Sequence, residues 1–509
     1  MLNLAVRNTR KLVRETSKAE NIRLGRFFTK KPTAALMAGL FTLTDAPLVS
    51  ILDPGAGTGI LSAALVEALC RRGRATEIHL VCYENNARYL PVLKNNLDRL
   101  RRKCRREYGV KLAASVLEEN YVLAQRDSYT ISFFSRQPEL FDFVIMNPPS
   151  ELIEKDSPEA LCAQDICPTA VNLNYLFAAM AMQNLRTGGE MVALLPTVFA
   201  TAVQLSKIRC SLLSQSVLER VHLFTDKSQG ALKNSLVIKL RKGGVSAPKI
   251  LLSVSTDDGT PEQTTLLPEL PYSLVVREED KSLLLFKSEE ELKLVRLIES
   301  LPSSFAAYGL RMKTGLTLLS RYPNLLSDTP GKGTVPLIHP RSIQDGRVVF
   351  PQPIRHQYLT PTIPSLVQKN KNMLLIKRFP AKAEQRKLVC GVYLASQLPN
   401  SRFISTHNKL NYVDMAGEAE MDAPFLYGLY AFLSSAVVDS YIRIISKSGQ
   451  INATELSDLP LPAAQTLREM GQKLIAIRVY SLEYCDKMVA EMLKQSRQKA
   501  KAPGTPVLK

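Results

Sequence analysis

The sequence lacks the features that would place a chain in or across a membrane. None of its apolar runs reaches the ~18 residues of a bilayer-spanning helix. The opening segment MLNLAVRNTRKLVRETSKAE carries too many charges to form the apolar centre of a secretory signal. We therefore expect a soluble cytoplasmic protein with no membrane partner.

Cysteine patterns typical of metal sites are also missing. The chain has 8 cysteines, but no CxxC pair and no His/Cys cluster with zinc spacing. We expect free thiols and no bound metal. No internal repeat is apparent, so a solenoid is not indicated.

Acidic residues are in the minority. Asp and Glu number 47 against 66 Lys and Arg, which gives a net charge of +19. Such a surface favours a polyanionic partner, either nucleic acid or an anionic membrane. Charge does not choose between them, and an ordinary basic enzyme can have the same balance.

The fold class predicted from the chain is α/β. At 509 residues the chain exceeds the ~250 to 300 at which single cores stop growing. Between 49 and 240, short apolar runs alternate with helical patterns, which predicts a mostly parallel, doubly wound, Rossmann-like sheet. Beyond about 300 the chain is punctuated by proline, which indicates a mixed α/β second domain. The expected divisions are 1–45 for a helical segment contributing to a ligand pocket, 46–245 for the Rossmann-like domain, 246–300 for a connector, 301–495 for the second domain and 496–509 for a disordered basic tail.

A glycine-rich turn, DPGAGTG, follows the apolar run VSIL and precedes a helical pattern. Alone it is a weak signal, because such turns also serve as plain helix connections. The next strand, IHLVCYE, ends in Glu84, whose carboxylate can accept both ribose hydroxyls of a nucleoside. Asp53 at the head of the loop suits a ligand with an ammonium group, which favours S-adenosylmethionine over NAD. The loop residues expected at this ligand are Asp53, Gly55, Ala56, Gly57, Thr58 and Gly59.

Two further segments are candidates for the same pocket. Asn120 and Tyr121 could meet the edge and face of an adenine ring, although a loop polar residue and a core tyrosine are equally good interpretations. Phe27 and Phe28, followed by Thr29, precede a helix. They fit either a hydrophobic staple or a pocket wall, and we favour the wall.

The sequence Asn147-Pro148-Pro149-Ser150 ends an apolar strand, at the edge where doubly wound sheets bind ligands. The prolines fix φ and remove backbone donors, which leaves carbonyl acceptors. The Asn147 amide oxygen and the Pro148 carbonyl could hold both hydrogens of a planar amine and aim its nitrogen at a methyl donor. A plain strand-ending turn is the alternative, which the upstream glycine loop disfavours.

The order of these motifs resembles a known family. LGRFFT, DPGAGTG, Glu84, NPPS and GGEMVALLP together resemble the gamma-class amino-methyltransferases that modify adenine in DNA. Three later segments are similar to the C-terminal half of type II adenine methylases of the PstI/BsuBI kind, namely KRFPAKAEQRKL, HNKLNYV and GQINATELSDLPLP. The resemblance implies a methyltransferase domain, a target-recognition domain, S-adenosylmethionine as cofactor and double-stranded DNA as partner. It also makes a cognate restriction endonuclease a candidate partner.

One residue departs from the family pattern. The family usually has Tyr or Phe after NPP, where the ring stacks on the flipped adenine, but this chain has Ser150. One lost stacking face corresponds to ~1 to 3 kcal/mol of base binding. Phe224 matches the family position that stacks on the other face. The resemblance therefore implies a catalytic set of Asn147, Pro148, Pro149, Ser150 and Phe224.

Basic segments provide the candidates for DNA contact. The densest run, 94–111, has helical spacing and fits a solvated helix face as well as a DNA contact. In the second domain, basic residues cluster around Phe379, which favours phosphate contacts there. The resemblance places HNKLNYV and GQINATEL near DNA as well. The resulting candidates are Lys377, Arg378, Lys382, Arg386, Asn408, Lys409, Asn411, Gln450 and Asn452.

Three functions are compatible with these residues. Site-specific methylation of adenine N6 in duplex DNA is the favoured one. A catalytically impaired DNA-binding relative, in which Ser150 marks decay, is the second. A methyltransferase acting on RNA or on a protein amide nitrogen uses the same NPP chemistry and is the third.

Overall fold

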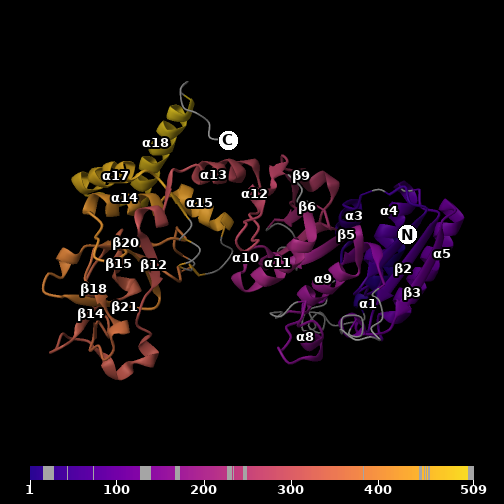
Figure 1. The fold of residues 1–509 in the computed structure, drawn as a ribbon, viewed down its shortest axis with the longest axis horizontal. Coiled ribbons are helices and arrows are strands. Elements are labelled where there is room, and N and C mark those ends of the chain that lie inside the picture. Colours follow the sequence, from indigo (N-terminus) through magenta and orange to yellow (C-terminus); the bar gives the residue numbers. More distant parts are fainter. Residues whose placement is uncertain are drawn as a thin grey trace. The chain divides into compact units, whose positions relative to one another are not determined.

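The chain forms two compact units, Met1–Glu289 and Glu290–Lys509, called here the first and the second unit. Figure 1 shows the first in indigo to magenta and the second in orange to yellow. The computed structural model describes residues 1–14, 28–42, 44–72, 74–125, 139–166, 172–225, 232, 234–244, 249–381, 383–445, 450–451, 453, 456 and 459–501.

The first unit is built on one large sheet, ordered β10-β8-β6-β7-β5-β4-β1-β2-β3, with β9 paired to β8. Its strands are β1 (Leu48–Asp53), β2 (Glu77–Tyr83), β3 (Lys111–Leu117), β4 (Phe141–Met146), β5 (Leu185–Pro196), β6 (Ser216–Phe224), β7 (Ser235–Lys242), β8 (Lys249–Ser255), β9 (Thr264–Leu266) and β10 (Leu270–Pro271). The strands from β3 to β5 pair in parallel, and β7 runs antiparallel between β5 and β6. The predicted doubly wound α/β sheet is confirmed.

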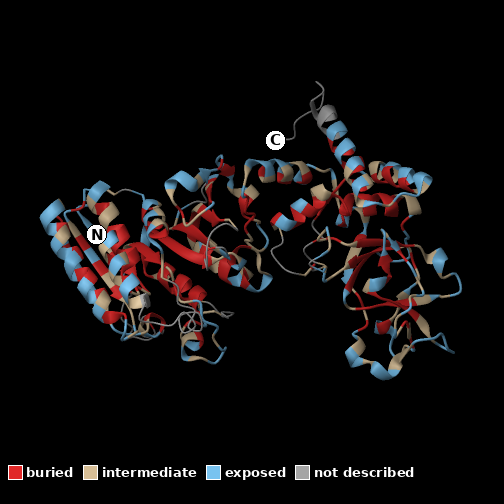
Figure 2. Ribbon diagram, turned by 180° about the vertical axis from the view of Figure 1, so that it is seen from behind, coloured by how far each residue is buried: buried red, intermediate tan, exposed pale blue. Residues whose placement is uncertain are grey.

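Helices cover this sheet on both faces, because its central strands are apolar and need cover on each side. The helices of the first unit are α1 (Leu2–Arg14), α3 (Lys31–Gly39), α4 (Ile60–Arg72), α5 (Leu90–Lys103), the π-helical turn η1 (Cys104–Tyr108), α6 (Tyr121–Ala124), α8 (Pro158–Cys162), α9 (Leu173–Gln183), α10 (Val198–Thr201), η2 (Val203–Leu205), α11 (Ser206–Gln215), η4 (Pro261–Gln263) and α12 (Tyr272–Val275). Figure 2 shows the sheet largely in red and the outer helix faces in pale blue. One core cluster joins α1, α3, α4 and α5 to the strands beneath them.

The segment expected to be a connector belongs in large part to the first unit. The run KILLSVS forms β8, which pairs in parallel with β6 and extends the sheet. An apolar strand of this kind is buried best by joining an existing sheet edge, which sequence spacing alone does not reveal. The boundary between units falls at Glu289, near the start of α13 (Glu289–Glu299), instead of spanning 246–300.

The second unit is mixed α/β, as predicted. A six-stranded sheet is ordered β12-β22-β19-β20-β16-β15, and a five-stranded sheet is ordered β13-β17-β14-β21-β18. The strands are β11 (Ser303–Ser304), β12 (Leu310–Thr314), β13 (Leu326–Ser327), β14 (Val335–Ile338), β15 (Ile343–Gln344), β16 (Arg347–Val348), β17 (Tyr358–Leu359), β18 (Gln368–Lys369), β19 (Met373–Lys377), β20 (Cys390–Tyr393), β21 (Phe403–Thr406), β22 (Leu410–Met415) and β23 (Pro460–Leu461). Short 3-10 helices are η5 (Ala306–Tyr308), η6 (Leu319–Arg321), η7 (Pro323–Leu325), η8 (Pro340–Ser342), η9 (Pro364–Leu366) and η10 (Ala395–Gln397).

The longer helices of this unit pack beside its six-stranded sheet. They are α14 (Ala423–Leu433), α15 (Ala436–Ile445), α17 (Ala464–Ile477) and α18 (Leu482–Lys501). Two glycines let α14 and α17 touch, because a Cβ at Gly428 or Gly471 would overlap the backbone of the other helix. The chain from 423 to 445 forms the two helices α14 and α15, and that from 464 to 501 forms α17 and α18. The expected basic tail continues α18 as far as Lys501, and the rest of it lies outside the described residues.

In the described part of the chain, no single helix has the length and apolar character to cross a membrane. The bent pair α14 and α15 meets that test jointly, by length and composition only.

Candidate active site

The glycine loop lies where β1 ends and α4 begins, as its sequence predicts. The Ala56 amide donates to the Tyr83 carbonyl oxygen at 3.0 Å, which draws the loop across the end of β2. Gly57 and Gly59 have φ of 57° and 80°, a left-handed conformation that favours glycine. The chain therefore makes a tight strand-to-helix turn at the carboxyl edge of the sheet.

Glu84 directs its carboxylate at this loop. One carboxylate oxygen accepts from the Gly57 amide at 2.8 Å, and the other accepts from the Asn86 amide at 2.8 Å. The second strand therefore ends with an acidic group fixed beside the loop. A carboxylate oxygen has more than one lone pair, so these bonds still leave acceptor capacity for ribose hydroxyls.

The NPPS turn lies against the same loop. A Cβ built at Gly55 would sit 3.7 Å from Pro149 Cδ and 3.4 Å from Phe177 Cε1, both ordinary van der Waals distances. Two motifs ninety residues apart in the sequence therefore meet at the adjacent ends of β1 and β4, which pair in parallel. This contact is the central feature of the candidate site.

The segment before α3 completes this region. The Asn147 side-chain amide nitrogen donates to Thr29 Oγ1 at 3.1 Å. Phe28 packs edge-on against Tyr89, with ring centroids 5.2 Å apart, and reaches to 4.0 Å from a Cβ built at Gly57. Phe28 thus lies beside the glycine loop and Thr29 beside the NPPS turn. Phe27 lies outside the described residues.

The structure corrects the expectation for Asp53. Its side chain is fully buried beneath the loop, where Ser62 Oγ donates to Oδ2 at 2.6 Å. The other oxygen, Oδ1, has no hydrogen-bond partner in the described part. Burial raises the pKa of Asp53 to about 7, against the opposing effect of the Ser62 hydrogen bonds. As the last residue of a buried strand, Asp53 supports the loop from below and does not line a pocket for an ammonium group.

Thr58 connects the loop to the N-terminal helix. Its hydroxyl lies 2.6 Å from Thr9 Oγ1, and its carbonyl accepts from the Asn96 amide nitrogen at 2.8 Å. Asn8 in turn donates to Asn96 at 2.7 Å. Sequence reasoning missed Thr9 and Asn96. The sequence offered one signal for Thr9, because this polar residue stands four positions after Ala5 and so lies on the buried face of α1.

Asn120 and Tyr121 take the structural roles that the sequence left open. The Asn120 oxygen caps the N-terminus of α6, and its amide nitrogen donates to Glu159 at 2.9 Å. Tyr121 is buried, with its ring 5.2 Å from Phe177 and its hydroxyl donating to Asn184 at 2.6 Å. The ring therefore packs behind Phe177, which lies beside the glycine loop.

The two stacking candidates differ in exposure. Ser150 is exposed at the end of the NPPS turn. Phe224 ends β6 with 3% of its surface exposed, and its ring meets His222 edge-on at 4.8 Å. A base could stack on Phe224 only after that ring had been uncovered.

In the second unit, the three segments expected near DNA lie side by side. The Arg378 amide donates to the Lys409 carbonyl at 2.9 Å, and the Ile451 amide donates to the Arg378 carbonyl at 2.9 Å. Asn411 is fully buried, and both ends of its amide are used within the protein. Its nitrogen donates to Ile451 O at 2.8 Å, and its oxygen accepts from Thr314 at 3.2 Å. Asn411 therefore ties the segments together and does not present a free edge to a base.

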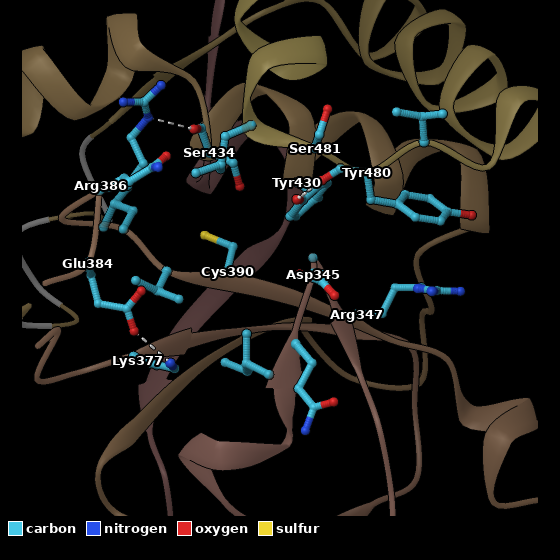
Figure 3. A pocket seen from close by; sticks show the side chains of 18 of the residues that line it. Asp345, Arg347, Lys377, Glu384, Arg386, Cys390, Tyr430, Ser434, Tyr480 and Ser481 are labelled. Atoms are coloured by element: carbon cyan, nitrogen blue, oxygen red, sulfur yellow. Dashed lines mark hydrogen bonds and ion pairs between the residues drawn. The ribbon is translucent and has the colours of Figure 1, made fainter.

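Two other DNA candidates line a cavity of about 900 Å³ between the sheet and the helices of this unit (Figure 3). Lys377 Nζ is 2.8 Å from a Glu384 carboxylate oxygen, as Figure 3 shows. Arg386 is 2.5 Å from Asp486. Both basic side chains are largely buried, so a DNA phosphate would have to compete with these acids. Lys382 and Asn452 lie outside the described residues.

The first unit has the Rossmann-like methyltransferase fold, with the glycine loop after β1, Glu84 after β2 and the NPPS turn after β4. Two relatives match nearly the whole chain. Type II methyltransferase M.PstI from Providencia stuartii is 27% identical over 512 residues, covering 98% of this chain and 97% of that protein. Type II methyltransferase M.BsuBI from Bacillus subtilis is 26% identical, covering 89% and 90%. The resemblance to the PstI/BsuBI group is confirmed.

The chain was also compared with protein-family models and with solved structures. No protein-family model matches the chain. A solved structure of the Type IIL restriction-modification enzyme MmeI in complex with DNA gives a TM-score of 0.49 at 11% identity, covering 92% of this chain and 71% of that one.

Proposed function

We propose that this protein is an S-adenosylmethionine-dependent DNA methyltransferase that modifies N6 of adenine in a specific duplex sequence. The contact between Gly55 and Pro149 carries the proposal, because it sets a nucleoside-binding loop against an amine-binding turn. Similarity to two type II methyltransferases over most of the chain supports it. On this proposal the protein serves as the modification enzyme of a restriction-modification system, with a cognate endonuclease as partner.

The residues around the loop fit the cofactor. Gly55 and Gly57 carry no side chain where a ligand would approach the backbone, and Glu84 offers a carboxylate at the end of β2. Phe28 supplies an apolar wall beside Gly57. S-adenosylmethionine, when bound, supplies an electrophilic methyl group.

The NPPS turn positions the acceptor. The Asn147 amide oxygen and the Pro148 carbonyl would accept both hydrogens of the adenine amine, whose lone pair is otherwise delocalised into the ring. Two fixed acceptors favour a more tetrahedral nitrogen and orient it, which is catalysis by positioning and electrostatics without a strong base. Thr29 holds the nitrogen end of the Asn147 amide and so turns the oxygen away from itself.

The target base must leave the helix to reach this turn, because a paired base inside a duplex is inaccessible. Extruding the base loses roughly a few kcal/mol of stacking and pairing free energy. Contacts between the protein and the rest of the duplex must offset this cost. In the second unit, Arg378, Asn408, Lys409 and Gln450 remain the candidates for those contacts. Their three segments are joined by hydrogen bonds into one surface.

A second function is favoured by Ser150. The exposed serine leaves one face of the acceptor site without an aromatic ring, as expected for a relative that binds DNA but methylates poorly. The two functions share the DNA-binding surface and differ in methyl transfer.

The deciding experiment incubates purified protein with tritiated S-adenosylmethionine and plasmid DNA, followed by nucleoside analysis. We expect labelled N6-methyladenine. Asn147→Ala should abolish labelling while cofactor binding by calorimetry survives, and Asn95→Ala, an exposed asparagine on α5, should leave both unchanged.

Three results would contradict the proposal. A gel shift without labelling would indicate the DNA-binding relative. Label only in added RNA or protein would indicate another acceptor. Full labelling by Asn147→Ala would refute the role of the NPPS turn.

A further inference from the structure

Phe379 is exposed in a way that no other described aromatic side chain is. Half of its surface (50%) is open, whereas every other Phe and Tyr in the described ranges is buried or partly buried. Single exposed apolar residues are common on proteins and need no explanation by themselves. The surroundings of Phe379 therefore decide whether its exposure has a function.

The ring stands on a rigid support. It follows β19 by two residues, and β19 lies inside the six-stranded sheet, between β22 and β20. The backbone of Arg378, its neighbour, is bonded on one side to Lys409 and on the other to Ile451, at 2.9 Å each. Pro380 fixes φ immediately after the ring. The backbone on either side of this residue is therefore held in place.

The chemistry around the ring is cationic. The Arg378 guanidinium carbon lies 5.4 Å from the Phe379 ring centroid, a cation–π distance, although the Nε atom itself is buried. Lys409 is exposed on the segment bonded to Arg378. An aromatic ring beside two basic residues suits a partner that offers both anionic groups and flat apolar faces, which duplex DNA does.

We propose that Phe379 is a wedge that inserts between base pairs of the bound duplex and fills part of the stack opened by base extrusion. The inference rests on the proposed function and deepens it. Proteins that kink DNA insert Phe, Leu, Ile, Met or Pro between base steps in this way. Arg378 and Lys409 hold the flanking phosphates, and the ring contributes stacking. No covalent step is involved.

The test compares Phe379→Ala and Phe379→Trp with Val349→Ala, which alters another exposed apolar residue of the second unit. Fluorescence anisotropy measures binding to unmethylated duplexes that contain the target sequence, as identified from the labelled plasmid DNA. We expect Phe379→Ala to weaken binding to the intact duplex at least about fivefold, the effect of losing one stacking contact. Tryptophan should preserve binding, and Val349→Ala should leave it unchanged.

Two further readouts separate a wedge from a general surface defect. With 2-aminopurine at the target position, Phe379→Ala should lower the extruded fraction in the bound duplex, because the gap left in the stack is no longer filled. The slope of log affinity against log salt should stay unchanged in Phe379→Ala, since a neutral ring releases no counterions, whereas Lys409→Ala should lower it by about one.

Equal affinity of Phe379→Ala and the unaltered protein, in a preparation that methylates DNA, would overturn the wedge and leave the proposed function standing. An unchanged extruded fraction in Phe379→Ala would also overturn it. Failure of the unaltered protein to bind any duplex would overturn both.

Discussion

The side-chain amide of Asn147 donates to the Thr29 hydroxyl across 3.1 Å, so a residue before the first sheet strand holds a side chain of the NPPS turn. We expect Thr29→Val to remove that acceptor and let the amide rotate. The rate constant for methyl transfer should fall about two- to tenfold, the range for one ordinary hydrogen bond. Single-turnover kinetics with methyl-labelled cofactor would measure it.

Thr29→Ser keeps the hydroxyl and should restore the rate. Cofactor affinity should change little in either variant if Thr29 acts through Asn147. An unchanged rate in Thr29→Val would show that the amide is held by other contacts.

Ser150 occupies an exposed position where the family usually carries a ring. Ser150→Tyr should restore a stacking face and strengthen binding of an extruded base by ~1 to 3 kcal/mol. Fluorescence of 2-aminopurine placed at the target position would report the extruded fraction, which we expect to rise. Ser150→Ala, which adds no ring, should show no rise. No gain with tyrosine would mean that another group already occupies that face.

The sheet and the two motifs were predictable because each depends on a local pattern. Alternating apolar runs indicate parallel strands, and strand ends in a doubly wound sheet share one edge. From that rule, DPGAGTG and NPPS had to lie close together. The contact of Gly55 with Pro149 agrees with it.

Side-chain direction was not predictable in the same way. Asp53 reads as a loop residue, but its position at the end of a buried strand points it inward to Ser62. The partner of Asn96 in the fold is a carbonyl 38 residues away in the chain, which no periodicity reveals. Asn120 was predicted only as an adenine contact or a loop polar residue, although asparagine before a short helical run is a recognised cap.

The bond from Asn96 to Thr58 leads to a prediction about the cofactor loop. Asn96 is buried and its amide bridges Asn8 and the Thr58 carbonyl. Asn96→Ala would leave that carbonyl unsatisfied, and we expect a loss of about 1 to 3 kcal/mol in the free energy of unfolding. Cofactor affinity should fall as well, because the loop loses an anchor, and calorimetric titration would show it.

The neighbouring Asn95 provides a matched control, since it is exposed on the same helix. Asn95→Ala should leave stability and cofactor affinity unchanged. If Asn96→Ala lost stability but bound cofactor normally, the bond would serve the fold alone.

The last prediction concerns pH. Burial raises the pKa of Asp53 from 3.8 to about 7, with Ser62 opposing the shift and Glu84 adding to it. The folded protein thus holds this proton more tightly than the unfolded chain does. The contribution of Asp53 to the free energy of unfolding is complete below pH ~4, falls between pH ~4 and ~7 and is lost above that. Asp53→Asn removes the titration, so the variant should match the unaltered protein near pH 4 and exceed it at pH 8 by up to about 4 kcal/mol. Urea unfolding across this range measures the difference.

Histidines such as His222, whose pKa burial lowers to about 4, titrate in both proteins, so their contributions cancel in the comparison. A curve for Asp53→Asn that runs parallel to that of the unaltered protein would show that the Asp53 carboxyl ionises as freely in the fold as in the unfolded chain.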